Sequence, residues 1–274
     1  MGAATLELPA GSVKDGSCSP CRGQSLGEEH RVNDDELVLV TGAGGGIGRE
    51  IVRQLTQQGL GVIAIDITEE AVAAAVAAAD PGAHIQGFAG DISDFKTARA
   101  SVAITGGHRL RGLVNCAGYF KEQQFEDVVE EDWTPILRSN LITAVSMCHA
   151  TLPRLREQRY GCVVNFSSTA GEFGSIRPAA LYAAAKAGVI GFSKGLAREY
   201  GPHNIRVNVI SPGPTDTSGF KKSADHDTSV AAGRTLLGRM GQPSDIANGV
   251  SYLLSPGAAW VTGEVLRVNG GSLI

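Results

Sequence analysis

Tyr182 and Lys186 stand four residues apart in LYAAAKAGV at 181–189, a segment that is otherwise aliphatic or glycine. In a helix, positions i and i+4 share a face, so the phenol and the ammonium point the same way. A free phenol has a pKa near 10, and a neighbouring ammonium stabilises the phenolate and lowers that pKa. The pair predicts a tyrosine that exchanges a proton with a ligand. The structural alternatives are a core tyrosine and a lysine whose end is solvated.

Hydroxyl and amide side chains upstream are candidates to share that ligand. Ser167 and Ser168 end the run GCVVNFSS, and Asn140 lies inside a long helical segment. A serine hydroxyl aimed at a carbonyl oxygen can share that oxygen with the tyrosine proton. The serines can also be ordinary strand-end hydrogen bonders, but the combined set predicts catalysis.

A glycine-rich turn, TGAGGGIG at 41–48, follows the first apolar run. Gly42, Gly46 and Gly48 allow positive φ and close approach of a phosphate, and the free amides of a helix that begins near Ile47 attract the anion. The spacing is not G-x-G-x-x-G, and no G-K-[ST] follows as in a P-loop. Between a strand and a helix, the turn predicts a dinucleotide site.

Two aspartates end the next two apolar runs. Asp66 lies eighteen residues after Gly48, where a carboxylate can accept both hydroxyls of an adenosine ribose and repel a 2′-phosphate. Because Gly45 leaves no cation in the turn to offset that repulsion, NAD(H) is expected rather than NADP(H). Asp66 can alternatively cap the following helix, although Thr68 can serve there instead. Asp91 is expected either to accept from the adenine amino group or to cap the next helix.

Seven short runs rich in β-branched residues alternate with longer helical segments. The runs are ELVLV, GVIAIDI, HIQGFAG, RGLVNCAG, GCVVNFSS, IRVNVISPG and EVLRVNGG. Helices are expected near 47–58, 69–79, 94–104, 130–157, 180–200 and 244–255. Continuous apolar strands suit a parallel sheet covered on both faces, which predicts a single α/β domain with a doubly wound sheet of seven strands. Ligands of such sheets bind beyond the carboxyl ends of the strands, where these motifs fall.

The 274-residue chain has a net charge of -4, with charges interspersed and no broad basic surface. Nucleic acid and membrane are therefore not expected partners, and small molecules and copies of the chain are. No apolar run approaches the roughly 18 residues of a membrane span, and the N-terminus lacks a secretory pattern, which predicts a cytoplasmic location.

Residues 1–35 lack periodicity and are expected to form a disordered extension, leaving 36–274 as the folded domain. Cys18 and Cys21 form a C-x-x-C without a second ligand pair, so no metal site is expected.

From about residue 36 to 274 the sequence resembles the short-chain dehydrogenases/reductases. The resemblance rests on TGAGGGIG at 41–48 for T-G-x-x-x-G-x-G, NCAG at 115–118 for N-N-A-G, Asn140, Ser168, YAAAK at 182–186 and PG at 212–213. It implies a Rossmann-type sheet, usually in a homotetramer. It also implies hydride transfer between C4 of nicotinamide and a secondary alcohol or ketone carbon, with the proton moving through Tyr182.

The resemblance assigns roles to single residues. Tyr182 would be the general acid/base, Lys186 would lower its pKa and hold the nicotinamide ribose, Ser168 would orient the substrate oxygen, and Asn140 would hold a proton-relay water. Asn115 would lie by the adenosine ribose, and Thr215 or Thr217 would contact the nicotinamide carboxamide or a phosphate. The expected cofactor contacts are Gly42, Gly46, Ile47, Gly48, Asp66, Asp91, Ile92, Asn115, Ala117, Gly118, Tyr182, Lys186, Pro212, Gly213, Thr215 and Thr217.

The chain departs from the family pattern in three places. Cys116 replaces the second asparagine of N-N-A-G, the interval from Ser168 to Tyr182 is one residue longer than usual, and residues 1–35 have no family counterpart. If the loop does not absorb the extra residue, Ser167 or Thr169 would be the working hydroxyl.

The expected reaction is NAD-linked oxidation or reduction of a small, cyclic or acyl-linked hydroxyl compound. A 3-oxoacyl-thioester reductase and a non-catalytic NAD-sensing protein are the alternatives. Arg177 is expected either to face the substrate pocket and receive an anionic group or to lie solvated on the surface, and Lys221, Lys222 and Arg234 are further cationic candidates. A segment after the Pro-Gly, rich in small residues, is expected to form a mobile lid.

Overall fold

The computed structural model describes residues 36–219 and 228–273, and the expected N-terminal extension, the Cys18–Cys21 pair, Lys221 and Lys222 lie outside them. The strands are β1 Glu36–Thr41, β2 Gly61–Asp66, β3 Ile85–Ala89, β4 Arg109–Asn115, β5 Gly161–Phe166, β6 Ile205–Pro212 and β7 Val265–Val268. The helices are α1 Gly46–Gln57, α2 Glu69–Val76, α3 Phe95–Ala103, α4 Glu130–Leu137, α5 Thr143–Gln158, α6 Thr169–Phe173, α7 Ala180–Tyr200, α9 Thr228–Gly233 and α10 Pro243–Leu254.

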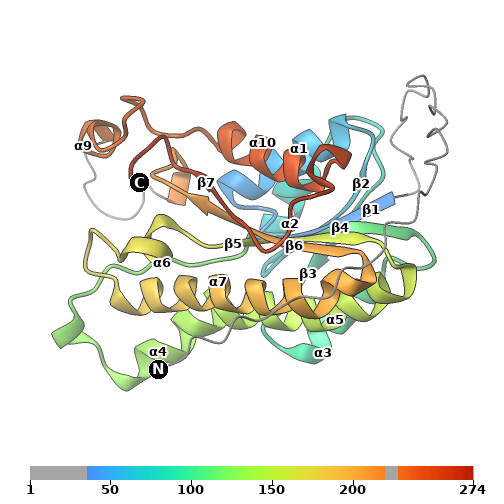
Figure 1. Cartoon of the computed structure of the whole chain (residues 1–274), viewed down its shortest axis with the longest axis horizontal. Coiled ribbons are helices and arrows are strands. Elements are labelled where there is room, and N and C mark those ends of the chain that lie inside the picture. Colours follow the sequence, from blue (N-terminus) through green and yellow to red (C-terminus); the bar gives the residue numbers. More distant parts are fainter. Residues whose placement is uncertain (1–35, 220–227, 274) are drawn as a thin grey trace, which may run out of the picture. The chain divides into compact units, whose positions relative to one another are not determined.

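All seven strands form one parallel sheet in the order β3-β2-β1-β4-β5-β6-β7 (Figure 1). The order reverses between β1 and β4, which creates the crevice where open α/β sheets bind ligands. The predicted fold class, a doubly wound seven-stranded parallel sheet of Rossmann type, is confirmed.

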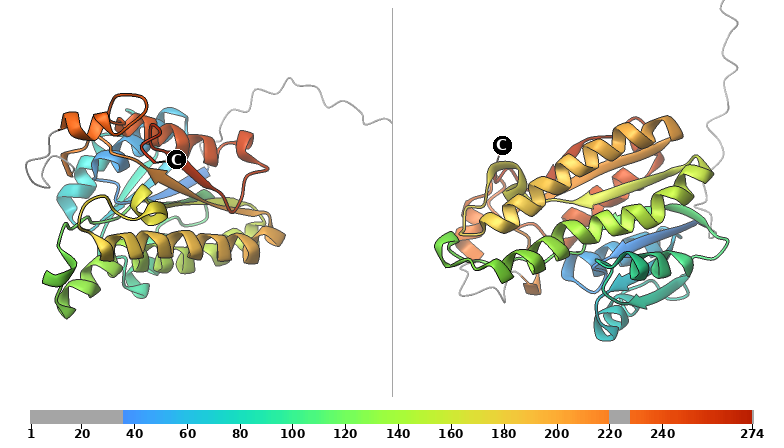
Figure 2. Two further views of the ribbon diagram at one scale, coloured as in Figure 1. Left: turned by 60° about the vertical axis from the view of Figure 1, so that its left-hand side comes forward. Right: turned by 90° about the horizontal axis from the view of Figure 1, so that it is seen from below.

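Alternate residues of each strand enter opposite layers, because successive side chains of a strand point to opposite faces. Val38 and Val40 of β1 pack with α1 and α10, whereas Leu37 and Leu39 pack with the layer that contains α3 and α5. Figure 1 shows α1 and α10 on one face of the sheet and α3, α5 and α7 on the other. Viewed from the α7 face, α5 and α7 run side by side (Figure 2).

Local capping explains where two of the helices begin. The Thr68 hydroxyl accepts from the Ala71 N–H at the start of α2, and the Asp94 carboxylate accepts from the Thr97 N–H at the start of α3. Neither Asp66 nor Asp91 caps a helix, so the capping alternatives considered for both are wrong.

The expected helix at 130–157 is interrupted between α4 and α5. Residues Arg138–Ile142 form a π-helical turn, which widens the helix at Asn140. The interruption could not be read from the apolar spacing, because one extra residue in a turn barely shifts the pattern of buried positions. The short helices α6 and α9 were also not predicted, since neither has enough turns to show a period.

Candidate active site

The glycine-rich turn closes against the loop after β4. Gly42 has a φ of +63°, and a Cβ on it would lie 2.7 Å from the Cα of Ala117. A Cβ on Gly48 would lie 2.1 Å from the Gly42 carbonyl oxygen. No side chain caps the first turn of α1, whose N-cap is Gly45. The turn therefore presents unpaired amide groups over a surface that only glycine backbone can form, which fits a diphosphate.

Asp66 lies beside this turn. Its Oδ2 accepts from the Gly44 N–H at 2.9 Å and its Oδ1 accepts from the Ile67 N–H at 2.7 Å. Two backbone donors fix the orientation of the carboxylate next to the glycines. The side chain is partly exposed and can still accept from a ligand hydroxyl.

Asp91 belongs to a surface cluster that joins the β3–α3 loop to the π-helical turn. Its carboxylate accepts from the Ser93 N–H and hydroxyl at 2.9 and 2.6 Å, and Arg138 lies 3.2 Å away. The hydrogen bonds from Ser93 and the charge of Arg138 lower the pKa of Asp91 below its ordinary value. Partial burial raises this pKa but is the weaker effect. The neighbouring Ile92 side chain is buried, and its carbonyl accepts from the Ser146 hydroxyl.

Asn115 differs from the expectation, because its side chain lies in the interior rather than in the cofactor crevice. Its Nδ2 donates to Asn165 Oδ1 at 2.8 Å, and Asn165 in turn donates to the Ser193 hydroxyl of α7 at 2.8 Å. The residue is 4% exposed. It joins β4 through β5 to the helix that carries Tyr182, and no ribose contact by its side chain follows from this placement.

Glycine at 118 lets two expected active-site side chains approach the backbone after β4. A Cβ there would lie 2.9 Å from Asn140 Oδ1 and 3.2 Å from Lys186 Nζ. Ala117 is held nearby by donation from its N–H to the Thr41 hydroxyl at 3.2 Å. Cys116 lines the same cleft, and burial raises the pKa of its thiol to about 12, so it remains a neutral packing group.

Tyr182 and Lys186 lie on one face of α7 as expected, and burial shifts the pKa of both groups. Lys186 Nζ donates to the Phe166 carbonyl at 3.0 Å and lies 5.8 Å from the centre of the Tyr182 ring. Burial raises the pKa of Tyr182, opposed by the hydrogen bond with Ser168 and the charge of Arg177. Burial also lowers the pKa of Lys186 to about 8. Desolvation therefore outweighs the attraction that sequence spacing suggested.

The two adjacent serines face different partners. Ser168 lies beside the phenol of Tyr182, whose pKa it lowers, and its hydroxyl accepts from the Ala170 N–H at 3.2 Å. Ser167 donates its hydroxyl to the Lys186 carbonyl at 2.9 Å and is buried. The loop between α6 and α7 therefore accommodates the extra residue while Ser168 stays against Tyr182. A φ of +83° at Gly174 begins that loop.

Asn140 fastens the π-helical turn to the loop after β4. Its Nδ2 donates to the Tyr119 and Ile136 carbonyls at 2.7 and 3.0 Å, and its Oδ1 accepts from the Tyr119 N–H at 3.2 Å. The side chain is 1% exposed. These bonds set the position of the π-helical turn beside Tyr119, and the proton-relay water expected at Asn140 stays a prediction.

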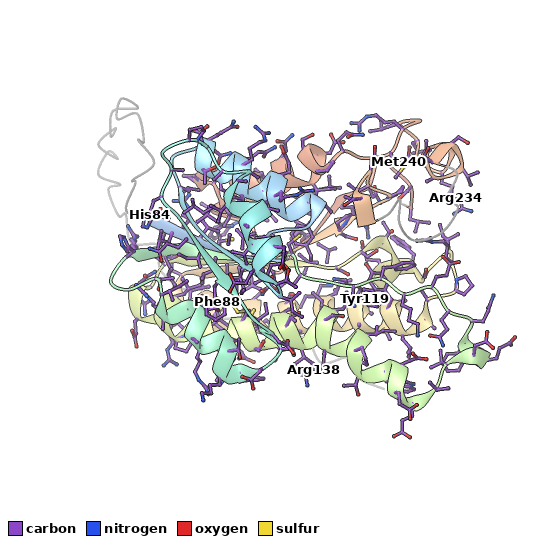
Figure 3. All side chains as sticks on the ribbon, turned by 180° about the vertical axis from the view of Figure 1, so that it is seen from behind. His84, Phe88, Tyr119, Arg138, Arg234 and Met240 are labelled. Atoms are coloured by element: carbon purple, nitrogen blue, oxygen red, sulfur yellow. The ribbon has the colours of Figure 1, made fainter. Side chains whose placement is uncertain are left out.

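A cleft of about 990 Å³ brings most of these residues together. Among its lining residues are Ile47, Gly118, Asn140, Ser168, Tyr182, Lys186, Pro212, Gly213, Thr215 and Thr217. The two threonines differ: Thr215 donates to the Gly213 carbonyl at 3.0 Å, whereas Thr217 lies against Gly46 of the glycine-rich turn. In Figure 3, Tyr119 and Arg234 lie toward one end of the molecule and His84, which precedes β3, lies toward the other. The cleft is thus at the carboxyl ends of the strands.

Arg177 lines the cleft, as one of the two expectations has it, and its guanidinium is paired with a carboxylate. Its guanidinium lies 3.0 Å from the Glu122 carboxylate and 4.4 Å from the centre of the Phe120 ring. Phe120 packs edge-on against Tyr182, with ring centres 5.0 Å apart. Sequence reasoning missed this arrangement, because the pairing joins two loops more than fifty residues apart.

Within residues 36–219 and 228–273, no helix is long and apolar enough to cross a membrane. The same part of the chain holds no group of three or more His, Cys, Asp and Glu side chains placed for a metal ion.

The chain is similar to known proteins over most of its length. A family model described as Enoyl-(Acyl carrier protein) reductase matches residues 42–272. The 3-oxoacyl-[acyl-carrier-protein] reductase FabG of Vibrio harveyi is 35% identical over 240 residues, covering 87% of this chain and 97% of that protein. The acetoacetyl-CoA reductase of Acinetobacter sp. is 35% identical over 248 residues, covering 88% and 98%. The crystal structure of levodione reductase superimposes with a TM-score of 0.81 at 31% identity, covering 86% and 97%.

A parallel sheet with a glycine-rich turn after β1 and a Tyr-Lys pair at the same crevice defines a Rossmann-type oxidoreductase. The chain belongs to the short-chain dehydrogenase/reductase family. It is therefore a nicotinamide-dependent oxidoreductase that acts on CH–OH or keto groups.

Proposed function

We propose that this enzyme uses NAD(H) and exchanges a hydride with a secondary alcohol or ketone. The observation that carries the cofactor preference is the Asp66 carboxylate, oriented by Gly44 and Ile67 beside the glycine-rich turn. A 2′-phosphate at that position would meet a negative charge, and the turn from Gly42 to Gly48 contains no cationic side chain. The same proposal includes Asp91, whose carboxylate is expected to accept a hydrogen bond from the adenine amino group.

When bound, the nicotinamide supplies or accepts the hydride at C4. Tyr182 exchanges the proton on the substrate oxygen, and Ser168, which lies beside the phenol, donates to the same oxygen and orients it. Lys186 has a pKa of about 8 and so is mostly charged at neutral pH. We assign it to the nicotinamide ribose, and its charge favours the phenolate. Asn140 belongs to the set as the residue that positions the π-helical turn beside them.

We propose a small, neutral, cyclic or acyl-linked hydroxyl compound as substrate. The Arg177 charge on the cleft wall is balanced by Glu122, which disfavours a site built around a substrate carboxylate. The first alternative is a 3-oxoacyl-thioester reductase, which the names of the relatives from Vibrio harveyi and Acinetobacter favour. We further propose a homotetramer in the cytoplasm, with no metal, nucleic-acid or membrane partner.

The test measures initial rates from nicotinamide absorbance with NAD⁺ and NADP⁺ over cyclic alcohols, dihydrodiols and hydroxyacyl thioesters. Turnover with NAD⁺ that falls by about 10³-fold in Tyr182→Phe, with NADH binding unchanged, is the expected result. Tyr252→Phe is the matched control, because Tyr252 is 44% exposed on α10, away from the cleft. Turnover with NADP⁺ alone would overturn the role of Asp66. A non-catalytic sensor would bind NADH and show no turnover with any substrate.

A further inference from the structure

After β7 the chain turns toward the end of the molecule where α9 lies (Figure 1). Asn269 organises this turn, residues 269–273, with three bonds. Its Oδ1 accepts from the Gly271 N–H at 2.9 Å, its Nδ2 donates to the Leu273 carbonyl at 2.8 Å, and its carbonyl accepts from the Ser272 N–H at 3.1 Å. Two consecutive glycines at positive φ, +60° and +74°, make the turn tight enough for those bonds.

The turn is fixed to both sides of the cleft. The Gly213 N–H donates to the Val268 carbonyl at 3.1 Å, and a Cβ on Gly213 would lie 2.8 Å from the Asn269 Cα. On the other side, the Leu237 N–H donates to the Gly270 carbonyl at 3.2 Å. The Pro-Gly segment and the segment that follows α9 are thus tied together by the residues after β7.

The last two described residues of the turn line the same cleft as Tyr182. Leu273 adds an apolar side chain to a wall that also includes Val230 and Ala231 of α9. The Ser272 hydroxyl oxygen is buried and has no hydrogen-bond partner among residues 36–219 and 228–273. A buried hydroxyl without a partner costs stability, and a polar atom of a ligand in the cleft would satisfy it.

We propose that Ser272 and Leu273 form the wall of the substrate site across from the reacting oxygen. Leu273 packs against the apolar body of the substrate, and Ser272 hydrogen-bonds to a second oxygen on it. Within the cyclic compounds of the proposed substrate class, this wall favours a ring ketone or alcohol that carries another oxygen. This inference rests on the proposed oxidoreductase function and narrows its substrate.

Two paired comparisons test the wall. The first compares cyclohexanone with cyclohexane-1,2-dione and cyclohexane-1,4-dione as substrates. Ser272→Ala should lower kcat/KM about tenfold for whichever dione the wild type reduces faster, and less than twofold for cyclohexanone. With cyclopentanone through cyclooctanone, Leu273→Ala should shift the preference toward larger rings by about tenfold, and Leu273→Phe should reverse that shift. The NADH dissociation constant should stay within about twofold in all three variants.

Leu237→Ala is the matched control, because it keeps the backbone N–H that donates to Gly270 and removes only a side chain that is 68% exposed. That side chain lines a separate hollow of about 480 Å³, which contains none of the predicted catalytic residues. It should leave the ring preference unchanged. Equal losses for all ketones in the Ser272 and Leu273 variants would overturn the proposal, because they would indicate a general structural role.

Calorimetric binding of the same ketones to Tyr182→Phe loaded with NADH separates this inference from the proposed function. Ring ketones that bind there, with the same dependence on Ser272 and Leu273, support the wall whatever the turnover. If no ring ketone binds, the substrate class is wrong, even if hydroxyacyl thioesters are oxidised and the proposed function holds.

Discussion

At the scale of single residues, burial decides the protonation of the proposed catalytic pair, Tyr182 and Lys186. Tyr182 and Lys186 both lie in surroundings that disfavour their charged forms, so the phenol's pKa rises while that of the lysine falls. The spacing in the sequence predicts that the two groups lie on one face of a helix, but it does not predict how strongly that face is shielded from solvent. The spacing therefore predicts that the two groups are neighbours, but it does not predict the burial that raises the pKa of the phenol.

The depressed pKa of Lys186 makes stability depend on pH. An exposed lysine titrates near 10.5 and Lys186 titrates at about 8. Between these values the unfolded chain binds more protons than the folded chain, so this residue's contribution to stability rises with pH. Compared with Lys186→Met, the wild type should gain about 2 kcal/mol of unfolding free energy from pH 8 to pH 10 in urea titrations. Parallel curves for the two proteins would contradict the shift.

A substitution at Asp66 can test the effect of its negative charge on cofactor binding while the shape of the side chain is kept. Asp66→Asn keeps an oxygen that can accept from the Gly44 N–H and removes the negative charge. We expect the NAD⁺ dissociation constant to rise about tenfold and the discrimination against NADP⁺ to shrink, measured by fluorescence titration with both cofactors. Asp94→Asn, at the cap of α3, should leave both affinities unchanged, since Asp94 does not line the crevice. An Asp66→Asn protein that still rejects NADP⁺ would place the discrimination elsewhere.

At the scale of elements, hydrogen bonds and an ion pair join two loops beside Tyr182, the proposed general acid/base. The Gln123 N–H donates to the Pro178 carbonyl at 2.7 Å, and Arg177 pairs with Glu122 one residue from each of these. Charged groups on this side of the cleft thus include Arg177, its partner Glu122 and, from the helix of Tyr182 itself, Lys186. Since the charge of Arg177 lowers the pKa of Tyr182, these loops act on the proposed general acid/base through charge as well as shape.

Removing the positive charge of Arg177 and removing the negative charge of Glu122 should move the pH–rate profile in opposite directions. Arg177→Gln removes a cation near the phenol, so the rise of alcohol oxidation with pH should shift to higher pH. Glu122→Gln removes the anion that balances Arg177, so the rise should shift to lower pH. Profiles of kcat/KM measured from pH 6 to pH 10 decide the question. A purely structural role for the pair would lower the rate in both variants without separating their profiles.

The glycine-rich turn provides a matched pair of substitutions. Gly48→Ala would place a methyl group 2.1 Å from the Gly42 carbonyl, whereas Gly45 has a φ of -69° and its nearest neighbour would lie 3.3 Å from an added Cβ. We expect Gly48→Ala to lose NADH binding by at least about 100-fold and to lower the unfolding temperature, because backbone must move. Gly45→Ala should bind NADH within a few fold of the wild type, measured by calorimetry. Equal losses in both would show that space in the turn is not the limiting factor.

At the scale of the whole molecule, the sequence was sufficient for the architecture because strand and helix periods are local. The seven apolar runs, the glycine-rich turn and the Tyr-Lys spacing can each be recognised from neighbouring residues alone, without knowledge of distant contacts. The features that could not be predicted depend on pairs far apart in the chain. Asn115 was assigned to the crevice, but its partner Asn165 lies on another strand, and Leu273 reaches the cleft only because β7 lies at the edge of the sheet next to β6.

Cofactor binding should be visible in the stability of the entire folded unit, since the turn after β1, Asp66 after β2 and Lys186 on α7 all belong to one sheet and its covering helices. A ligand at 100 times its dissociation constant adds about 2.7 kcal/mol to the unfolding free energy. For a domain of this size that corresponds to about 5–10 °C in unfolding temperature. We expect NADH to produce this shift in the wild type and in Tyr182→Phe at concentrations where NADPH does not. Gly48→Ala should show no shift with either, and a larger shift with NADPH than with NADH would show that the Asp66 carboxylate does not govern which cofactor the enzyme accepts.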